Sequence, residues 1–177
     1  MVRTFTLFKR KRLSRDVFVY AGELEREPET DRVSSLAYSI DQNSRHFELW
    51  RHSHPTSNIV LTGDFKGFLG HSADISGSHF VASAKRNGKF RSGWTFEYMS
   101  KSYKWSVSLM SRSWKLKDED DSVIAEFDRA SLSISKVGVL KIFEDMNDES
   151  FREMVLVTCE IVHRTVKSTE RKGGGGG

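Results

Sequence analysis

The sequence predicts a mainly β fold, a closed antiparallel β-barrel with a hydrophobic C-terminal helix through its middle. Apolar and polar residues alternate in many short runs, which places one set of side chains on a buried face. One late segment is apolar all round, as expected of a helix that is buried on every side. Closing the strands into a barrel around this helix also removes exposed strand edges.

The length and composition indicate one folded domain. The chain has 177 residues, with 12 Phe, 4 Trp, 4 Tyr and 1 Cys. The aromatic content excludes a disordered chain, and the single cysteine excludes a disulfide scaffold. No run of 18 apolar residues is present, which excludes a conventional membrane-spanning helix.

Three segments are expected along the chain. Residues 1–32 should form a basic strand region and an acidic loop within the barrel. Residues 33–168 should form the rest of the barrel, with its helix at about residues 150–168. Residues 169–177 end in a glycine run and should form a flexible tail.

The strands are expected in chain order from the alternating runs and the turn signals between them. Two short strands are expected around residues 5–8 and 17–20. Clearer alternation follows at residues 36–40, 47–49, 94–98, 103–109, 114–116, 123–127, 132–134 and 140–142. Turn signals stand at residues 41–44, 53–55, 87–88, 118–121 and 137–138, and the glycine-rich residues 63–70 suit a bend. We expect roughly nine to twelve short strands, and they follow one another along the chain at the spacing typical of a sandwich or barrel.

The last segment changes to a helical pattern. Ser150 and Glu153 have the spacing of a capping box, and Asp148 and Glu149 suit the positive end of a helix. The following residues 154–162 are almost wholly apolar, and basic residues follow them. A β-strand is the competing interpretation, because Val and Ile are abundant. The capping box before the apolar residues and the basic residues after them favour the helix.

Several of these segments resemble the tubby C-terminal-like superfamily, which includes the phospholipid scramblases and the LURP-one-related proteins. The resemblance rests on SLAYSI at 35–40, HFELWR at 46–51, YKW at 103–105, WKL at 114–116, VIAEF at 123–127, GVLKI at 138–142 and MVLVTCEIVH at 154–163. These segments lie within residues 33–166, about three quarters of the chain. The chain is most similar to the fungal branch, a domain of unknown function.

The resemblance implies a barrel of about twelve strands around a hydrophobic C-terminal helix, and it implies no established reaction. Some members are phosphoinositide-tethered adaptors, and lipid scrambling has been attributed to others. This chain lacks the cysteine-rich and Pro-rich segments of the scramblases and the long extension of tubby. No lipid-binding residue can be carried over by motif.

The charge is concentrated near the N-terminus. The chain carries a net charge of +4, yet residues 1–20 hold six basic residues against one acidic residue. The candidate lipid- or anion-binding residues are Lys9, Arg10, Lys11 and Arg12, supported by Arg15. The same cluster also suits nuclear targeting, a nucleic-acid contact or a solvated turn between two strands. Aromatic residues are not interleaved with the cations, which disfavours nucleic acid.

Other polar residues are expected to be structural. His46, His52 and His54 lack a carboxylate or cysteine at a metal-site spacing, so we expect solvated loop histidines and no metal. Cys159 falls inside the apolar helix and should behave as a small hydrophobe. A buried Glu160 should meet Arg, Lys or water at a barrel mouth, because an unpaired buried charge is costly.

Together these observations predict a non-enzymatic binding module without a cofactor. It would tether to anionic membrane lipids, with phosphoinositides as the candidates, or to a protein partner, through its basic loop. The alternatives are an enzyme with a polar site at a barrel mouth around Glu160 or His163, and a purely structural or protein-interaction domain. The expected location is the cytoplasm or the membrane periphery, with the nucleus as the alternative.

Overall fold

The architecture is a closed antiparallel barrel around one helix, as expected from the sequence. A computed structural model describes residues 2–11, 14–28, 36–53, 55–66, 71–87, 93–108, 111–130, 133–143 and 148–173. Its strands are β1 (Arg3–Lys9), β2 (Val17–Ala21), β3 (Leu36–Gln42), β4 (His46–Ser53), β5 (Thr56–Lys66), β6 (Ser72–Gly77), β7 (Val81–Arg86), β8 (Trp94–Tyr98), β9 (Lys101–Ser106), β10 (Ser113–Lys117), β11 (Val123–Arg129) and β12 (Lys136–Ile142). The helix is α1 (Glu149–Gly173).

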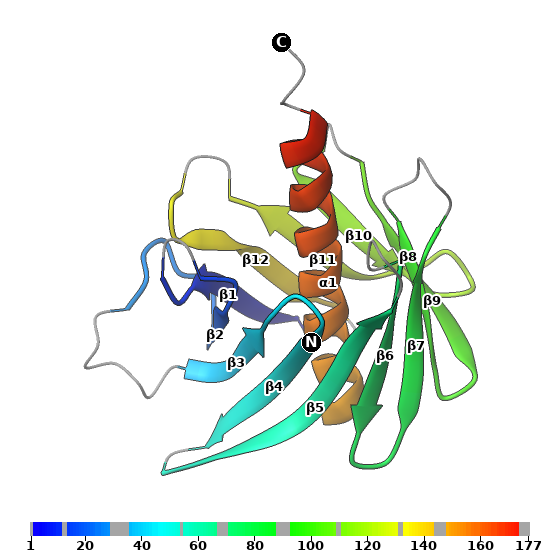
Figure 1. The fold of residues 1–177 in the computed structure, drawn as a ribbon, viewed down its shortest axis with the longest axis horizontal. Coiled ribbons are helices and arrows are strands. Elements are labelled where there is room, and N and C mark those ends of the chain that lie inside the picture. The colour runs from blue at the N-terminus through cyan, green and yellow to red at the C-terminus, as the bar shows by residue number, and fades with distance from the viewer. Residues whose placement is uncertain are drawn as a thin grey trace.

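The strands form a simple meander that closes on itself. Each strand pairs with its neighbours in sequence, and β1 pairs with β12 to complete the ring (Figure 1). This closing ladder runs from Arg3 opposite Ile142 to Phe8 opposite Lys136. The end of the first strand therefore lies beside the beginning of the last.

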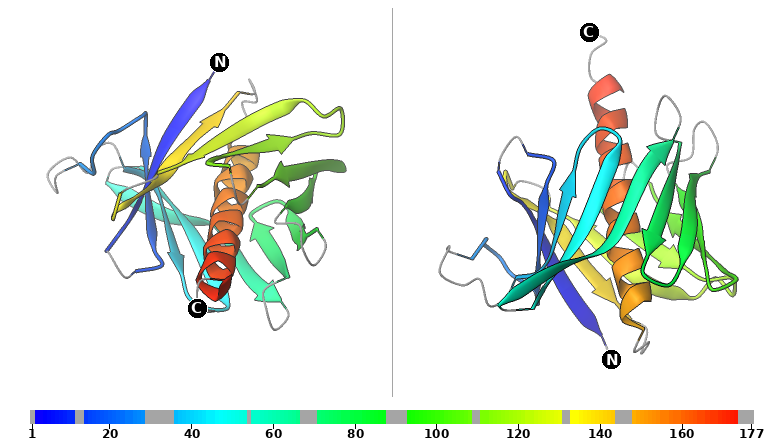
Figure 2. Two further views of the ribbon diagram at one scale, coloured as in Figure 1. Left: turned by 90° about the horizontal axis from the view of Figure 1, so that it is seen from above. Right: turned by 60° about the horizontal axis from the view of Figure 1, so that its bottom comes forward.

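Helix α1 fills the barrel. Figure 2 shows the strands arranged around the helix, whose C-terminal end projects beyond one end of the barrel. Every residue from Glu153 to His163 is buried, which confirms a helix that is apolar nearly all round. Inside the barrel, the Trp105 indole donates a hydrogen bond to Thr158 Oγ1 over 3.0 Å, which ties β9 to the helix. The described part of the chain contains no helix that is both long and apolar enough to cross a membrane.

The two ends of α1 differ from the expectation. The residue that caps the helix is Asp148, whose Oδ1 accepts a hydrogen bond from the Phe151 amide over 3.1 Å. The expected capping box of Ser150 and Glu153 is therefore wrong, because Glu153 turns to Arg51 of β4 instead. At the other end the helix continues past residue 168 to Gly173.

Three local expectations along the strands are also wrong. Val137 and Gly138, expected in a turn, lie inside β12, where Gly138 leaves room for the Phe127 ring of β11. The glycine-rich segment does not begin with a bend, because Gly63 lies inside β5 against the Phe47 ring. The rest of that segment, residues 67–70, lies outside the described residues. Ile134 was expected in a strand, but it lies in a bend before β12.

Candidate anion-binding site

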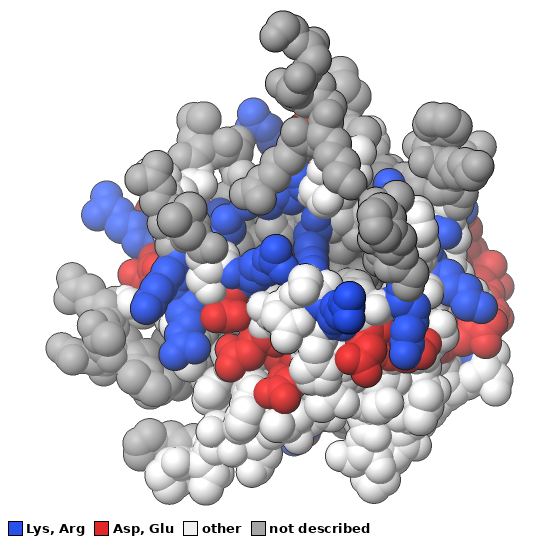
Figure 3. Space-filling model, viewed as in Figure 1, with Lys and Arg blue, Asp and Glu red and all other residues white. Residues whose placement is uncertain are grey.

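One end of the barrel is rich in basic side chains. On the face shown in Figure 3, Lys and Arg gather toward the end from which α1 projects, and Asp and Glu form a band below them. Lys9 of β1, residues 133–134 before β12 and the C-terminal half of α1 line one cavity at this end, and the Arg164 guanidinium of α1 reaches Ser44 between β3 and β4. We call it the basic end.

The basic cluster expected from the sequence lies at the basic end. Lys9 is the last residue of β1, and the exposed Arg10 and Lys11 follow it into the connection to β2. The Arg10 guanidinium lies 5.7 Å from the centroid of the Phe18 ring. Arg12 lies outside the described residues, and Arg15 is exposed just before β2.

The helix joins this cluster through Gln42 of β3. The Gln42 side-chain amide donates to the carbonyl oxygen of Arg15 over 2.6 Å and to Glu160 Oε1 over 2.9 Å. The guanidinium of Arg164 donates to the carbonyl oxygen of Ser44 over 3.0 Å. Burial lowers the pKa of Arg164, and the charge of Arg15 lowers it further, so these two cations share one region of the surface.

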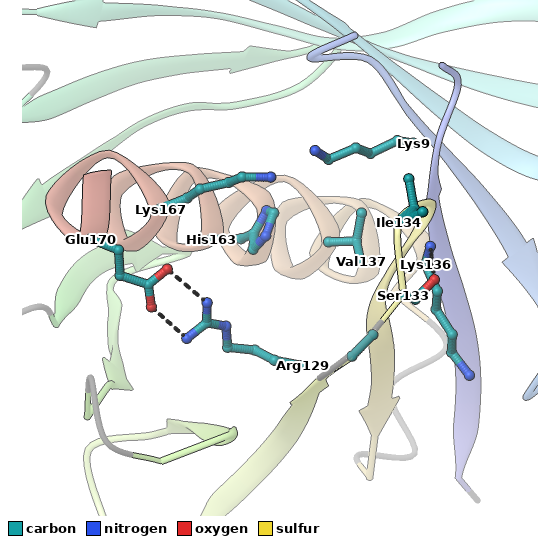
Figure 4. A pocket seen from close by; sticks show the side chains of 10 residues that line it. Lys9, Arg129, Ser133, Ile134, Lys136, Val137, His163, Lys167 and Glu170 are labelled. Carbon is teal, nitrogen blue, oxygen red and sulfur yellow. Dashed lines mark hydrogen bonds and ion pairs between the residues drawn. The ribbon is translucent and has the colours of Figure 1, made fainter. Parts of the chain in front are cut away.

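A small cavity lies at the basic end between α1, β1 and the connection from β11 to β12. Its volume is about 130 Å³. Figure 4 shows it from close by, with side chains that come from elements far apart in the sequence. It is lined by Lys9, Arg129, Ala130, Ser133, Ile134, Lys136, Val137, His163, Lys167 and Glu170.

The cations of this cavity differ in what they contact. Arg129 makes a bidentate contact with Glu170, at 2.9 and 3.1 Å, so the charges of this pair offset each other. The Lys136 ammonium donates to the carbonyl oxygen of Leu24 over 2.6 Å. The side chains of Lys9 and Lys167 point toward one another across the cavity (Figure 4).

His163 connects the cavity to the buried carboxylate of Glu160. Its Nδ1 lies 3.2 Å from Glu160 Oε2. Glu160 was expected to meet Arg, Lys or water, and its described hydrogen-bond partners are instead Gln42 and His163. Cys159 is buried as expected, and burial raises the pKa of its thiol, with Glu160 adding to the effect.

The remaining histidine candidates lie in a strand instead of a loop. His46 Nδ1 is 2.9 Å from Asp64 Oδ1, and His52 Nε2 is 2.9 Å from Ser39 Oγ, which places both histidines within the ladder of β4 and its neighbours. His54 lies outside the described residues. Within the described ranges, no group of three or more His, Cys, Asp and Glu side chains is placed to hold a metal ion.

The opposite end of the barrel carries a polar cluster that sequence reasoning missed. Glu153 is only 2% exposed, and it meets the Arg51 guanidinium at 2.6 and 2.8 Å. Arg51 also pairs with Glu149 at 2.7 Å. Burial raises the pKa of Glu153, while Arg51 opposes the shift. This pair fixes the N-terminal end of α1 against β4.

Sequence reasoning identified only part of the basic cavity. It proposed Lys9, but it did not assign Arg129, Lys136 or Lys167 to a binding site, and it considered His163 only for catalysis. A signal was available, because closing a barrel brings the end of the first strand beside the start of the last, where Lys136 stands. The basic residues that follow the apolar part of the helix were the second signal.

Of the comparisons with known proteins, only the search of solved structures finds a similar protein, and it supports the fold alone. No protein-family model matches the sequence, and no curated protein matches it. A search of solved structures finds the X-ray structure of a protein from Arabidopsis thaliana, with 10% sequence identity and a TM-score of 0.58. The match covers 90% of this chain and 91% of the plant protein's chain. The chain shares its fold with this plant protein.

Proposed function

We propose that this chain is a non-enzymatic, tubby-like binding module that attaches to anionic membrane lipids through the basic end of its barrel. Phosphoinositides are the headgroups we propose. The proposal includes membership of the tubby C-terminal-like superfamily, in the fungal branch that the sequence resembles most. The cytoplasmic leaflet is the proposed location, because that leaflet carries the anionic lipids.

The observation that carries the proposal is the meeting of two basic segments around one cavity. Lys9 from β1 and Lys167 from α1 line the cavity together, and Arg15 lies close enough to Arg164 to lower its pKa. Each such cation contributes about 1 kcal/mol of attraction near an anionic membrane. Cations that gather at one end of a barrel can act together on one flat surface, whereas cations spread around a barrel cannot.

The exposed side chain of Ile134 gives this end a second feature suited to a membrane. Ile134 is 65% exposed and lines the same cavity as Lys9 and Lys167. An apolar side chain beside a group of cations can enter the boundary between headgroups and acyl chains, where peripheral proteins bury apolar residues.

Co-sedimentation with lipid vesicles tests the proposal. We expect the full chain to bind vesicles of phosphatidylcholine with added phosphatidylinositol bisphosphate, and not vesicles of phosphatidylcholine alone. Binding should weaken as the salt concentration rises, because salt screens exposed charges. A variant with Gln at residues 9–12 should bind more weakly. Binding that is unchanged in this variant, or no binding at low salt, contradicts the proposal.

Catalysis at the barrel mouth is the second candidate, favoured by the contact between His163 and Glu160 beside the cavity. A carboxylate that orients an imidazole is a common arrangement for moving a proton. Hydrolysis of a panel of phosphate and carboxylate esters by the wild type, lost in His163→Gln, would favour this candidate. Equal rates in both proteins would reject it.

A further inference from the structure

The end of the barrel opposite the basic end exposes most of the large apolar side chains that the fold leaves in water. Lys9 ends β1 at the basic end and neighbouring strands are antiparallel, so odd-numbered strands begin and even-numbered strands finish at the opposite end. Of the seven large apolar side chains exposed in the described part of the chain, five lie there. We call this set the apolar rim, and it consists of Val2, Val81, Met99, Val123 and Phe143.

Met99 lies in the turn between β8 and β9, where its backbone is strained. Tyr98 pairs with Lys101, which leaves Met99 and Ser100 as the two residues of the turn, with φ angles of 48° and 62°. A two-residue hairpin turn with positive φ at both positions favours Asn and Gly, because other side chains crowd the backbone there. The Met99 side chain is 73% exposed, so it gains little from packing. Strain without compensating burial indicates a role other than stability.

An acidic turn interrupts the apolar rim. The connection between β10 and β11 carries four carboxylates in a row, at residues 118–121. Glu119 Oε1 accepts a hydrogen bond from the Ser102 amide of β9 over 2.7 Å, which holds this turn beside the turn that carries Met99. Lys117 pairs with Asp121 at 2.8 Å. In the described part of the chain, the exposed Asp120 carboxylate has no hydrogen bond or ion pair.

The spacing of the strands sets the size of a segment that fits across the acidic turn. Neighbouring strands lie about 4.8 Å apart, so the path from the β8–β9 turn to the start of β11 is roughly 10–15 Å long. Extended chain advances about 3.3 Å per residue, so about four or five residues cover this path. The acidic turn repels an anionic membrane, whereas a cation between two apolar side chains complements both the turn and the apolar side chains beside it.

We propose that the apolar rim binds a partner protein through a short extended segment that carries Lys or Arg between two apolar side chains. Met99 and Val123 contact the apolar side chains, and Asp120 pairs with the cation between them. Met99 suits this role, because its unbranched and polarizable side chain adapts to different apolar partners. The inference goes beyond the proposed function and does not rest on it, since the two surfaces lie at opposite ends of the barrel.

Selection from a phage-displayed library of random short peptides tests the chemistry of the partner. The target is the full chain. We expect enriched peptides that carry Lys or Arg, with an apolar residue about two positions away on each side. The absence of this pattern among the enriched peptides, or the absence of any enrichment, overturns the inference.

Two variants of the β8–β9 turn separate the Met99 side chain from the strain of its backbone. Met99→Asn and Ser100→Gly each place a residue that tolerates positive φ in the turn. With the most enriched peptide, fluorescence polarisation should show about tenfold weaker binding to Met99→Asn and wild-type binding to Ser100→Gly. Equal affinity of Met99→Asn and the wild type, or an equal loss in Ser100→Gly, overturns the inference.

The melting temperature provides a second readout for Met99. Met99→Asn should melt roughly 1–4 °C above the wild type, because Asn relieves the strain at this position. Weaker peptide binding by a more stable protein cannot come from a loss of folding. A lower melting temperature would show that the Met99 side chain serves stability, and it would overturn the inference.

A pair of carboxylate variants tests the contact with the cation. Asp120→Asn should weaken binding of the same peptide by roughly threefold. Asp128→Asn is the matched control, because this exposed carboxylate of β11 lies toward the basic end, and we expect wild-type binding. The same affinity in both variants overturns the role of Asp120.

Two further measurements test other occupants of the apolar rim. Sedimentation velocity detects self-association, and flotation with vesicles of phosphatidylcholine alone detects insertion into a neutral membrane. Self-association or vesicle binding that Met99→Asn abolishes would assign the rim to a second copy of this chain or to a membrane, and would overturn the inference. Wild-type protein that remains monomeric and does not float supports a partner segment. The peptide experiments contain no lipid, so their outcome is independent of the proposed function.

Discussion

At the scale of single residues, the buried carboxylate of Glu153 controls the electrostatics of one end of the barrel. Burial holds its pKa above the ordinary value of 4.5, although Arg51 opposes the shift. Between these two pKa values, the native state binds more protons than the unfolded chain. The contribution of Glu153 to stability is therefore fully present below about 4.5 and is lost as pH rises through the raised pKa.

The first prediction follows from the direction in which burial shifts the pKa of Glu153. The free energy of unfolding of the wild type, minus that of Glu153→Gln, should fall as pH rises above about 4.5 and then level off. Urea unfolding at a series of pH values measures this difference. The subtraction cancels the contributions that the other carboxylates make to the pH dependence in both proteins. A difference that stays flat, or that rises with pH, contradicts a pKa of Glu153 that burial raises.

Removing Arg51 gives the second prediction. Arg51→Met leaves the Glu153 carboxylate buried without its cation, and breaking a buried pair in this way costs about 3–5 kcal/mol. Arg152→Met is the control, because Arg152 lies 4.0 Å from the half-exposed Glu149 and acts on Glu153 more weakly than Arg51 does, so its loss should cost less than the loss of Arg51. Equal losses of unfolding free energy in the two variants contradict the assignment of Arg51 as the cation that compensates the buried Glu153 carboxylate.

Single residues could be predicted from the sequence where local pattern decides their environment. Cys159 lies inside a helix that is apolar nearly all round, so its burial followed from its neighbours. The pairing of Arg51 with Glu153 could not be predicted, because the two residues are 102 positions apart and meet only through the register of the barrel around α1. His163 was recognised as polar, but its position at a cavity depends on residues from β1 and β11.

At the scale of elements, the hydrogen bond between Trp105 and Thr158 fixes how α1 sits in the barrel. The bond joins β9 to the middle of the helix, where both side chains are buried. Thr158 also donates to the carbonyl oxygen of Met154 over 2.9 Å, which orients its hydroxyl oxygen toward the indole. A donor buried in the core without an acceptor is costly, so this contact should matter to stability.

Thr158→Val gives the third prediction. The variant keeps the shape of the side chain and leaves the Trp105 indole without its acceptor, which should cost about 1–3 kcal/mol. Thr165→Val is the control, because among the described residues Thr165 Oγ1 donates only to the carbonyl oxygen of Ile161 in its own helix. Thermal unfolding followed by circular dichroism compares the two. A larger loss in Thr165→Val would show that the indole contact does not hold the helix.

Two of the errors at this scale share a cause. Glycine was interpreted as a turn signal, yet Gly138 and Gly63 lie in strands. A Cβ at Gly138 would stand 2.5 Å from Phe127 Cζ, and one at Gly63 would stand 2.1 Å from Phe47 Cζ. In a barrel wrapped tightly around aromatic side chains, glycine makes space for a ring on the neighbouring strand. That need depends on cross-strand register, which a single sequence does not contain.

At the scale of the whole molecule, the sequence was most informative. Alternating runs and one helix that is apolar nearly all round together require a barrel that encloses the helix, and the structure has this arrangement. The concentration of basic residues near the N-terminus was also visible in the sequence. The contribution of Lys167 on the helix to the same cavity was not visible in the sequence. Only the closure of the barrel and the path of α1 bring Lys9 and Lys167 to one cavity.

The fourth prediction concerns the central claim, that anionic lipid binds at the basic end. We compare two double variants with equal loss of charge, Lys9→Met with Lys167→Met, and Lys104→Met with Lys115→Met. The first pair lines the cavity, whereas the second pair is exposed on β9 and β10. Two lysines near a membrane contribute about 1 kcal/mol each, so losing the first pair should weaken binding by about 30-fold.

The measurement that tests this claim most directly is the affinity of both variants for vesicles of phosphatidylcholine with added phosphatidylinositol bisphosphate, determined by flotation at low salt. The account predicts a large loss of binding for the cavity variant and nearly wild-type binding for the control. Equal binding by the two variants would contradict it, because attraction would then depend on total charge and not on the basic end of the barrel.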